Sequence, residues 1–393
     1  MPETAAVICE YNPFHNGHLI QLEKIRKIKG DDTRIVAIMS GSIVQRGTLA
    51  IYPKYARAAA AVKCGADLVL ELPCPFSCGS AEYFARAGVM LADLTGIADS
   101  LCFGSESGDI TALEEAADRI SSPEFLDAIR SAEKSRSHQR SAEAVYRSMY
   151  GEGFPTSPND ILAVSYLAAL KNAESAIRPF TYKRQPGFTA SGTREALLSG
   201  GSTDGMIPEA ANTAFSGIKP TDETLYSAAA LYVIRNTPTE TLSSFFGMNG
   251  GVSGLLHNNA DGVGTVGELV ARCTCPKYSA SRLRRAILSA VIGITPEDMT
   301  QPPMFTNLLA ANSRGREMLS AIKKTGFPVV TKPADGKLLP PHALPQYSLG
   351  RKADALFALS RKEPPSDMMK MMPTIVLFLP EFIDCLQIGE VKL

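Results

Sequence analysis

Cysteine is scarce in this sequence, with eight residues in 393. Several of them, such as Cys64, Cys102 and Cys385, lie in apolar stretches, where a reduced cysteine behaves as a small hydrophobe. We therefore expect no disulfide framework. Two pairs of cysteines lie close together in the sequence, Cys74 with Cys78 and Cys273 with Cys275. Neither pair shows two C-x-x-C knuckles or a histidine at zinc spacing, so structural zinc is the weaker alternative for them.

An excess of either charge is also missing, because 40 lysines and arginines balance 40 aspartates and glutamates. Such a chain has no global field to draw in polyanions, so any nucleic-acid surface must be local. The longest apolar runs, such as 374–380, fall far short of the ~20 residues that span a bilayer, which excludes an integral membrane protein. Residues 1–10 lack the basic region and cleavage site of a signal peptide, so we expect a cytoplasmic protein.

The hydrophobic fraction of 45% is that of an ordinary globular chain. In the first half, short β-branched runs alternate with amphipathic segments, the pattern of a doubly wound α/β fold with a parallel sheet. We expect its strands at 5–9, 34–39, 67–71, 100–103 and 177–181. Helices are expected at 18–28, 52–64, 81–94 and 113–120, with longer helical stretches at 124–150 and 159–171 before the last strand.

The second half of the chain has a different character. Strand-like runs become rare from about residue 207, and helical segments follow one another at 223–235, 266–272 and 281–292. A glycine-rich stretch at 199–205 leads towards this part. Because 393 residues exceed the ~250–300 that one core usually organises, we expect two domains, a catalytic α/β domain at 1–210 and a mainly helical domain at 211–393.

The most informative segment is 9–18, which reads CEYNPFHNGH, follows the first strand and contains an H-x-G-H. A helix that begins at the carboxyl end of such a strand presents free amides and partial positive charge to phosphate. His15 and His18 can both face phosphates there, and Gly17 would let a purine ring approach the backbone. Their N–H groups would stabilise the charge that develops as pyrophosphate leaves. A turn histidine and a helix residue without a ligand are the alternative, which the position at the first strand-to-helix crossing disfavours.

Further motifs follow in order along most of the chain: Ser40, Gly41, Gln45, Arg46 and Gly47; LVLELP at 68–73; FGSE at 103–106; SPNDIL at 157–162; residues 278–294; Gly315; and FPVVTK at 327–332. Together with 10–18, they resemble the tRNA(Met) cytidine acetate ligases of the H-x-G-H nucleotidylyltransferase superfamily. The resemblance implies a Rossmann-like, HUP-type catalytic domain. It also implies that ATP, with Mg²⁺, activates acetate as acetyl-adenylate, and that the N4 amine of the wobble cytidine of elongator tRNA(Met) is then acetylated.

The resemblance also implies which residues bind ATP, with His15 and His18 as the catalytic pair nearest the reacting phosphate. Gly104 would leave room for the adenosine, Asn159 offers a donor and an acceptor, and Arg184 can hold phosphate oxygens in a planar fork. A turn glycine, a helix cap and a solvated arginine are their alternatives. The full set is Val7, Ile8, Cys9, Glu10, Tyr11, Asn12, Pro13, Phe14, His15, Asn16, Gly17, His18, Leu19, Ile20, Gly104, Asn159, Arg184 and Arg194.

Two segments depart from the family pattern. At 189–194, TASGTR takes the place of the hydroxyl-rich S-x-T-x-I-R motif, in which a helix start and an arginine grip the β- and γ-phosphates. Arg194 keeps its spacing, so we retain it as a phosphate ligand. After the second strand, Ser42 and Ile43 replace an asparagine and an aromatic residue, which bears on the shape of the acyl pocket.

Basic residues gather on the expected helix at 281–292. Arg282, Arg284 and Arg285 follow Lys277 and Tyr278, and no acidic residue lies between Arg272 and Glu297. A solvated helical face is the ordinary meaning of such a run. With the family resemblance, we expect Lys277, Arg282 and Arg285 to contact the tRNA backbone.

Two other functions stay open at this point. The H-x-G-H chemistry also serves small-molecule nucleotidylyltransferases and acyl-activating ligases that act on a protein thiol, from which the helical second domain distinguishes this chain. A non-catalytic RNA-binding protein that keeps the nucleotide fold is a further alternative, which the intact His15 and His18 disfavour.

Overall fold

The computed structural model describes residues 2–132, 138–185, 187–361 and 377–378. Cys385 and most of the apolar run 374–380 lie outside the described residues. Within them, no helix is both long and apolar enough to cross a membrane.

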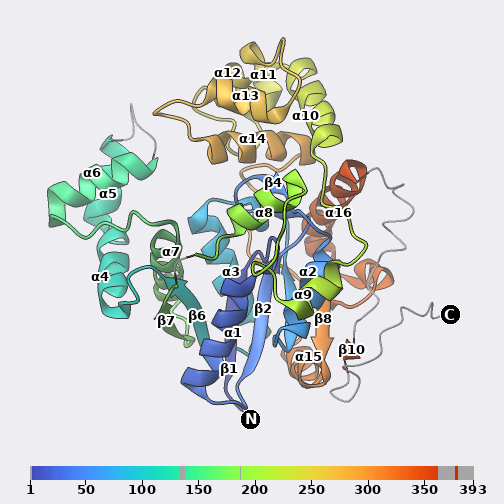
Figure 1. Cartoon of the computed structure of the whole chain (residues 1–393). Coiled ribbons are helices and arrows are strands. Elements are labelled where there is room, and N and C mark those ends of the chain that lie inside the picture. Colours follow the sequence, from blue (N-terminus) through green and yellow to red (C-terminus); the bar gives the residue numbers. More distant parts are fainter. Residues whose placement is uncertain (1, 133–137, 186, 362–376, 379–393) are drawn as a thin grey trace.

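A twisted, mostly parallel sheet forms the centre of the molecule (Figure 1). Its strand order is β10-β8-β5-β2-β1-β6-β7, with β9 paired to β8, and β5 and β8 are the antiparallel neighbours. The strands are β1 (Thr4–Cys9), β2 (Arg34–Ser40), β5 (Leu68–Leu72), β6 (Ser100–Ser105), β7 (Arg178–Lys183), β8 (Thr306–Asn312), β9 (Val329–Val330) and β10 (Leu377–Phe378). A separate hairpin pairs β3 (Ile43–Val44) with β4 (Thr48–Leu49).

The strand order places a topological switch point between β1 and β6. From β1 the chain moves outward through β2 to β5, then crosses to β6 and moves the other way to β7. Ligands of doubly wound folds bind in the crevice that opens beyond the carboxyl ends of the strands at such a point. The segments that follow β1 and β6 therefore frame the expected site.

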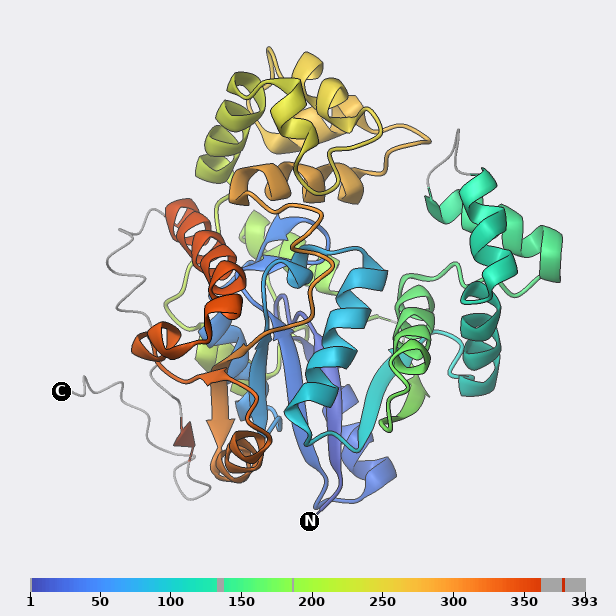
Figure 2. The same ribbon diagram turned by 180° about the vertical axis from the view of Figure 1, so that it is seen from behind.

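Helices cover both faces of the sheet, since alternate residues of β1 enter two different cores. Ala5 and Val7 pack with α1 (Asn16–Lys29), α2 (Lys54–Lys63) and α9 (Glu209–Phe215). Ala6 and Ile8 pack on the opposite face, which four helices cover: α3 (Ala81–Thr95), α4 (Ile110–Ile120), α7 (Pro158–Asn172) and α15 (Ser313–Thr325). Figure 2 shows this second face from behind.

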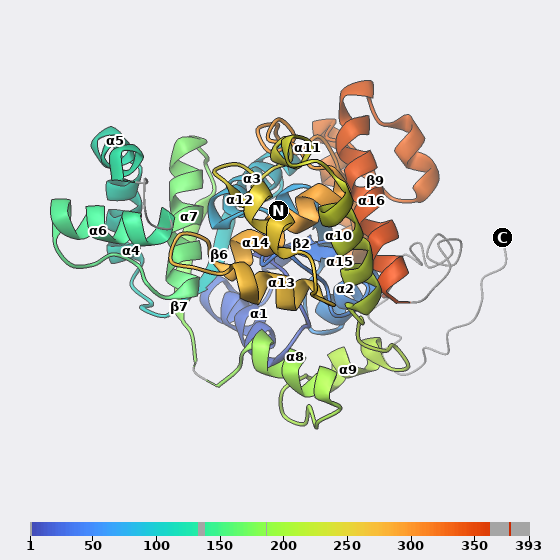
Figure 3. The ribbon, with the colours of Figure 1, turned by 90° about the horizontal axis from the view of Figure 1, so that it is seen from above.

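A helical module lies over the carboxyl ends of the strands, at the end of the molecule opposite the N-terminus (Figures 1 and 3). It contains α10 (Thr224–Asn236), α11 (Thr239–Ser243), α12 (Val252–Asn259), α13 (Val266–Cys273) and α14 (Ala280–Ile292). Its core also takes in Ile43, Val44 and Leu49 of the hairpin and residues of α16 (Leu344–Ser360). The module is thus packed onto the sheet part through an apolar interface.

Two helices, α5 (Pro123–Ala132) and α6 (His138–Tyr150), project to one side (Figure 1). Their small apolar cluster includes Phe125, Ile129 and Tyr146. The sequence predicted one helical stretch over 124–150, and residues 133–137 within it lie outside the described residues. The remaining helices are α8 (Ala190–Ser199) and the short 3₁₀ turns η1 (Phe76–Cys78), η2 (Pro333–Leu338) and η3 (Pro341–Ala343).

The expected doubly wound fold is confirmed, and all five expected strands are present within one or two residues of their predicted ends. The helices expected at 223–235, 266–272 and 281–292 are present as α10, α13 and α14. The division into 1–210 and 211–393 stays a prediction. β8 pairs with β5, so residues 306–312 belong to the same sheet as the strands of 1–210.

Candidate active site

A cleft of about 580 Å³ opens at the switch point between β1 and β6. Its size is in the range of small-molecule and cofactor sites. It is lined by the residues that follow β1, the first turn of α1, the ends of β6 and β7, and the starts of α7 and α8. Eleven residues that were expected to bind ATP line it: Ile8, Cys9, Glu10, Tyr11, Asn12, His15, His18, Gly104, Asn159, Arg184 and Arg194.

The two histidines form the N-terminal cap of α1. His15 is the N-cap residue, and its Nδ1 accepts a hydrogen bond of 3.0 Å from the Gly17 amide. The Nδ1 of His18 accepts one of 3.2 Å from the His15 amide. Because Nδ1 is the acceptor in both rings, the proton of each neutral imidazole resides on Nε2. The rings stack with centroids 3.8 Å apart.

Burial keeps both imidazoles neutral. Burial, together with the charges of Arg184 and Arg194, lowers the pKa of His15 to about 4. Burial, then His15 and Arg184, holds the pKa of His18 well below its ordinary value. Near pH 7, the pair therefore presents two neutral N–H donors whose tautomer is fixed by the helix cap.

The other seven residues expected at the ATP site lie outside the cleft lining, namely Val7, Pro13, Phe14, Asn16, Gly17, Leu19 and Ile20. Val7 packs in the core beneath α1, α2 and α9. Phe14 is fully buried, and the centroid of its ring lies 4.8 Å from that of Tyr11. Asn16 Nδ2 donates to the carbonyl of Gly205, 2.7 Å away. The prediction covered a continuous segment, whereas strand and helix geometry turns only part of it towards the cleft.

Gly17 and Gly104 also have a packing role. A Cβ on Gly17 would lie 2.8 Å from Cε1 of His15, and one on Gly104 would lie 2.9 Å from atoms of Tyr182 and Arg184. Their role in this structure is to let His15 and Arg184 lie close to the backbone.

A connected set of polar groups lines the side of the cleft beyond β6. Asn159 Nδ2 donates to Oε1 of Glu106, and Asn159 Oδ1 accepts from Nη1 of Arg184 at 3.4 Å. Glu106 also accepts from the Ser157 hydroxyl at 2.8 Å and from the Asp160 amide at 3.1 Å. Ser157, and not Asn159, is the N-cap of α7. The network fixes the Asn159 amide and leaves the Arg184 guanidinium at the cleft wall.

The N-terminus of α8 forms the opposite wall. Thr189 is its N-cap, and Thr189, Ala190 and Ser191 line the cleft. Arg194 donates to the carbonyl of Asn12 at 2.7 Å and to the Ser191 hydroxyl at 3.3 Å. The divergent segment thus supplies hydroxyls, a helix start and a guanidinium, which together favour an anion.

One buried arginine at the site was not identified from the sequence. Arg57 of α2 is fully buried and donates to the carbonyls of Tyr52 at 3.0 Å and Ser40 at 3.1 Å, and also to those of Glu10 and Gly41. It ties the carboxyl end of β1 to that of β2. In the sequence, it is one of three basic residues in an alanine-rich helix, and no pattern marks it as buried.

The basic residues of α14 and of the segment before it are not equivalent. Arg282 and Lys277 lie over the Tyr278 ring, each 5.1 Å from its centroid. Arg285 is partly buried, and its Nη1 donates to the carbonyl of Gln45 at 3.3 Å. Gln45 and Arg46, in the β3–β4 turn, line the cleft. Arg285 thus contacts the turn that lines the cleft, whereas a solvated helical face was the alternative to its predicted contact with tRNA.

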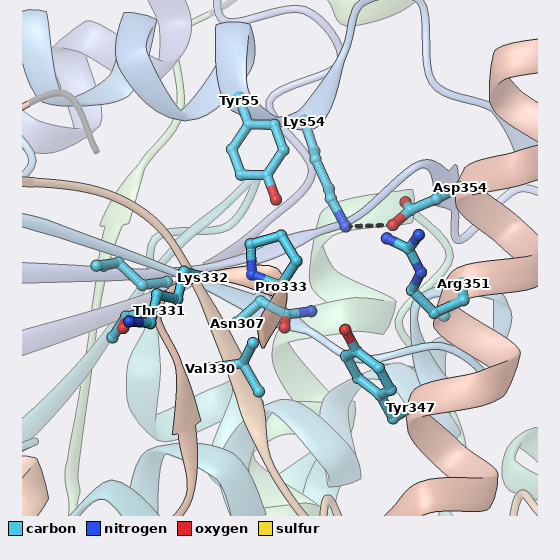
Figure 4. Close-up of a pocket in the computed structure, with 12 residues that line it drawn as sticks. Lys54, Tyr55, Asn307, Val330, Thr331, Lys332, Pro333, Tyr347, Arg351 and Asp354 are labelled. Atoms are coloured by element: carbon cyan, nitrogen blue, oxygen red, sulfur yellow. Dashed lines mark hydrogen bonds and ion pairs between the residues drawn. The ribbon is translucent and has the colours of Figure 1, made fainter. Parts of the chain in front are cut away.

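A second pocket of about 20 Å³ lies between α2, β8 and α16 (Figure 4). Lys54 Nζ lies 2.9 Å from Oε2 of Glu71 and 2.9 Å from Oδ2 of Asp354, whose other oxygen accepts from the Ser42 hydroxyl at 2.6 Å. This volume has room for about one water molecule, so it accommodates neither acetate nor a nucleotide. Ser42 and Ile43, which depart from the family pattern, are not among the residues that line the large cleft. Ser42 donates to Asp354 of α16, and Ile43 packs in the core of the helical module.

Metal ligands do not gather in the described part of the chain, where no three histidine, cysteine, aspartate or glutamate side chains cluster. Its cysteines are free, and Cys74 and Cys78 are buried. The residues present thus do not build a magnesium cage. Because Mg²⁺ usually keeps several waters and binds through substrate phosphates, the ion would accompany ATP.

Comparisons with known proteins agree with this geometry. Residues 2–370 match the HIGH Nucleotidyl Transferase family. The tRNA(Met) cytidine acetate ligase of Acetivibrio thermocellus is 32% identical over 84% of this chain and 88% of its own length. That of Syntrophotalea carbinolica is 34% identical over 83% of this chain and 84% of its own. A crystal structure of Thermotoga maritima TmcAL bound with alpha-thio ATP superposes with a TM-score of 0.87 at 26% identity, covering 96% of this chain and all of that one.

The chain thus has paired histidines at a switch-point cleft, and it is similar to these proteins along most of its length. We conclude that the chain belongs to the HIGH nucleotidyl transferase family and, within it, to the tRNA(Met) cytidine acetate ligases.

Proposed function

We propose that this protein is an ATP-dependent ligase that activates acetate and transfers the acetyl group to a cytidine of tRNA. Acetate attacks the α-phosphate of ATP, pyrophosphate leaves, and the N4 amine of the wobble cytidine of elongator tRNA(Met) takes the acetyl group from acetyl-adenylate. The observation that carries the proposal is the neutral Nε2–H pair of His15 and His18 at the switch-point cleft. The cytoplasm, where tRNA is available, is the proposed location.

The first step needs stabilisation of the negative charge that develops on phosphoryl oxygens as pyrophosphate departs. His15 and His18 are held in place before the substrate arrives, so their N–H groups need no reorganisation during the reaction. Arg184 on one wall and Arg194 with the α8 N-terminus on the other supply the charge for the phosphate chain. A bound Mg²⁺ would neutralise part of the phosphate charge.

Acetate-dependent release of pyrophosphate from ATP tests this step. We expect release to require acetate and to occur without tRNA. A small-molecule nucleotidylyltransferase would instead release pyrophosphate only with another acceptor, and a non-catalytic RNA-binding protein would release none. Pyrophosphate release that is indifferent to acetate would contradict the proposal.

Arg184→Lys should raise the apparent KM for ATP with little change in kcat. Lysine keeps the charge but loses the fork that binds two phosphate oxygens, and a contact equally strong in the ground and transition states affects only KM. Steady-state kinetics with varied ATP check this. Arg178→Lys, at the exposed start of the same strand, is the matched control. Normal ATP kinetics in both Arg184→Lys and Arg184→Ala would remove Arg184 from the nucleotide site.

The helical module is proposed to bind tRNA, because α14 lies over the carboxyl ends of the strands where the cleft opens (Figure 1). Charge reversal at Lys277 and Arg282 should weaken tRNA binding. Each lost phosphate contact should reduce the log–log salt slope by roughly one, since fewer counterions are released. Titrating tRNA at several salt concentrations measures the slope. Reversal of the exposed Arg316 on α15 is the control, and an unchanged slope in the α14 variant would leave these residues as a solvated face.

A further inference from the structure

The cleft contains a carboxylate whose negative charge does not suit the anionic substrates of the adenylation step. Glu10 directly follows β1 and lines the cleft with His15, Arg46 and Arg194. Acetate and the phosphates of ATP are all anionic, so a carboxylate among them opposes binding unless it has another task. The second half-reaction offers one, because the cytidine amine loses a proton when it becomes an amide.

Glu10 is held at both its backbone and its side chain. Its carbonyl accepts from the buried Arg57, and Oε1 of its carboxylate accepts from the Gln45 amide at 2.6 Å. Among the described residues, the backbone amide of Gln45 is the one group that donates a hydrogen bond to this carboxylate, so Oε2 remains available to a substrate. The group is thereby fixed before the substrate binds.

The turn that holds Glu10 is itself held by the helical module. The Gln45 carbonyl accepts from Arg285 of α14 at 3.3 Å. Gly47 lies so close to α14 that a Cβ would stand 2.5 Å from the Arg285 amide nitrogen. The helix proposed to contact tRNA thus sets the turn that positions Glu10, which places this carboxylate where the cleft faces the second substrate.

The surroundings of Glu10 suit a proton acceptor. Burial raises the pKa of its carboxyl group, while the Gln45 amide and the charges of Arg194, Arg57 and Arg46 oppose the rise. A carboxyl whose pKa moves towards the working pH is a better general base. The other titratable groups that interact with it electrostatically are Cys9, Cys78 and Tyr166.

Other candidates in the cleft are committed elsewhere. Among the described lining residues, Glu106 is the second carboxylate, and it already accepts from Ser157, Asn159 and the Asp160 amide. The histidines carry their proton on Nε2, and with a pKa of about 4 His15 is a weak base.

Resting on the proposed function, we propose that Glu10 is the general base of acetyl transfer. The N4 amine of cytidine attacks the acetyl carbonyl of acetyl-adenylate, and a C–N bond forms. The bond between the acetyl carbon and the phosphate oxygen breaks, and AMP leaves with that electron pair. The proton lost by the amine passes to the Glu10 carboxylate and then to solvent.

The test separates the two half-reactions in Glu10→Gln. Glutamine keeps an oxygen that accepts from the backbone amide of Gln45 but cannot take up a proton, so acetyl transfer should fall by a larger factor than acetate-dependent ATP–pyrophosphate exchange. Transfer from chemically synthesised acetyl-adenylate to tRNA should fall by ~10²–10⁴, the usual contribution of a general base. Wild-type transfer should rise as pH passes the pKa of Glu10, and the variant should lose this dependence. Glu10→Asp, which retains a carboxylate, should recover part of the transfer rate.

Glu223→Gln is the matched control, because Glu223 is also a carboxyl with a raised pKa in the field of Arg194 but does not line the cleft. Wild-type transfer by Glu10→Gln, equal loss of both half-reactions, or a Glu10→Asp variant no better than Glu10→Gln would each overturn the assignment. Failure of the proposed function has a different signature, since the wild-type protein itself would then not acetylate tRNA.

Discussion

Alanine at His15 or at His18 is expected to slow acetate-dependent ATP–pyrophosphate exchange by ~10²–10³, the usual cost of removing one preorganised donor to a developing negative charge. Each ring receives a backbone amide at Nδ1 and presents Nε2–H to the cleft. The two losses should not add, because each histidine orients the other: the His15 amide donates to His18, and the rings stack at 3.8 Å.

Isotope exchange between pyrophosphate and ATP, with and without acetate, measures this effect. His342→Ala removes an exposed histidine of η3, outside the cleft lining, and should exchange like the wild type. Wild-type exchange in both cleft variants would exclude the histidines from the mechanism.

Replacing Lys54 by methionine is expected to reduce the free energy of unfolding by ~3–5 kcal/mol, as when one partner of a buried ion pair is removed. Although burial alone would lower the pKa of Lys54, Asp354 and Glu71 raise it above its ordinary value. Lys54 is 6% exposed and Glu71 4%. Figure 4 shows Lys54 with Asp354 of α16. Without the ammonium group, the carboxylates of Glu71 and Asp354 would lose the cation that they share between the sheet and α16.

Urea unfolding measures this loss as a lower midpoint at an unchanged slope. Lys171→Met is the matched control, since its ion pair with Asp118 is exposed at both partners and should contribute only ~0–1 kcal/mol. Equal midpoints for Lys54→Met and Lys171→Met would show that the buried cluster does not hold α16 in place.

The local sequence pattern was sufficient to predict the parallel strands of the sheet. β1, β2, β5 and β6 are largely apolar runs separated by helices, and sterics and hydrophobic periodicity determine such units over short distances. β8 was missed because its place depends on antiparallel pairing with β5, more than 200 residues earlier, which no local pattern encodes.

The same distinction applies to the site. The H-x-G-H predicted the paired histidines, since its position after the first strand fixes their place in a doubly wound fold. The contacts of Arg57 with carbonyls of two strand ends, and of Arg285 with the Gln45 carbonyl, were not predictable. In the sequence, both are basic residues on amphipathic helices, and only tertiary packing distinguishes a buried arginine from a solvated one.

The most direct test of the proposed function uses elongator tRNA(Met) and the same tRNA with its wobble cytidine replaced by uridine. Each is incubated with the protein, ATP and labelled acetate. We predict that label enters the first tRNA as an N4-acetylated cytidine and does not enter the second, while both reactions form acetyl-adenylate. Equal labelling of the two tRNAs, or acetyl-adenylate that never transfers its label to RNA, would contradict the account.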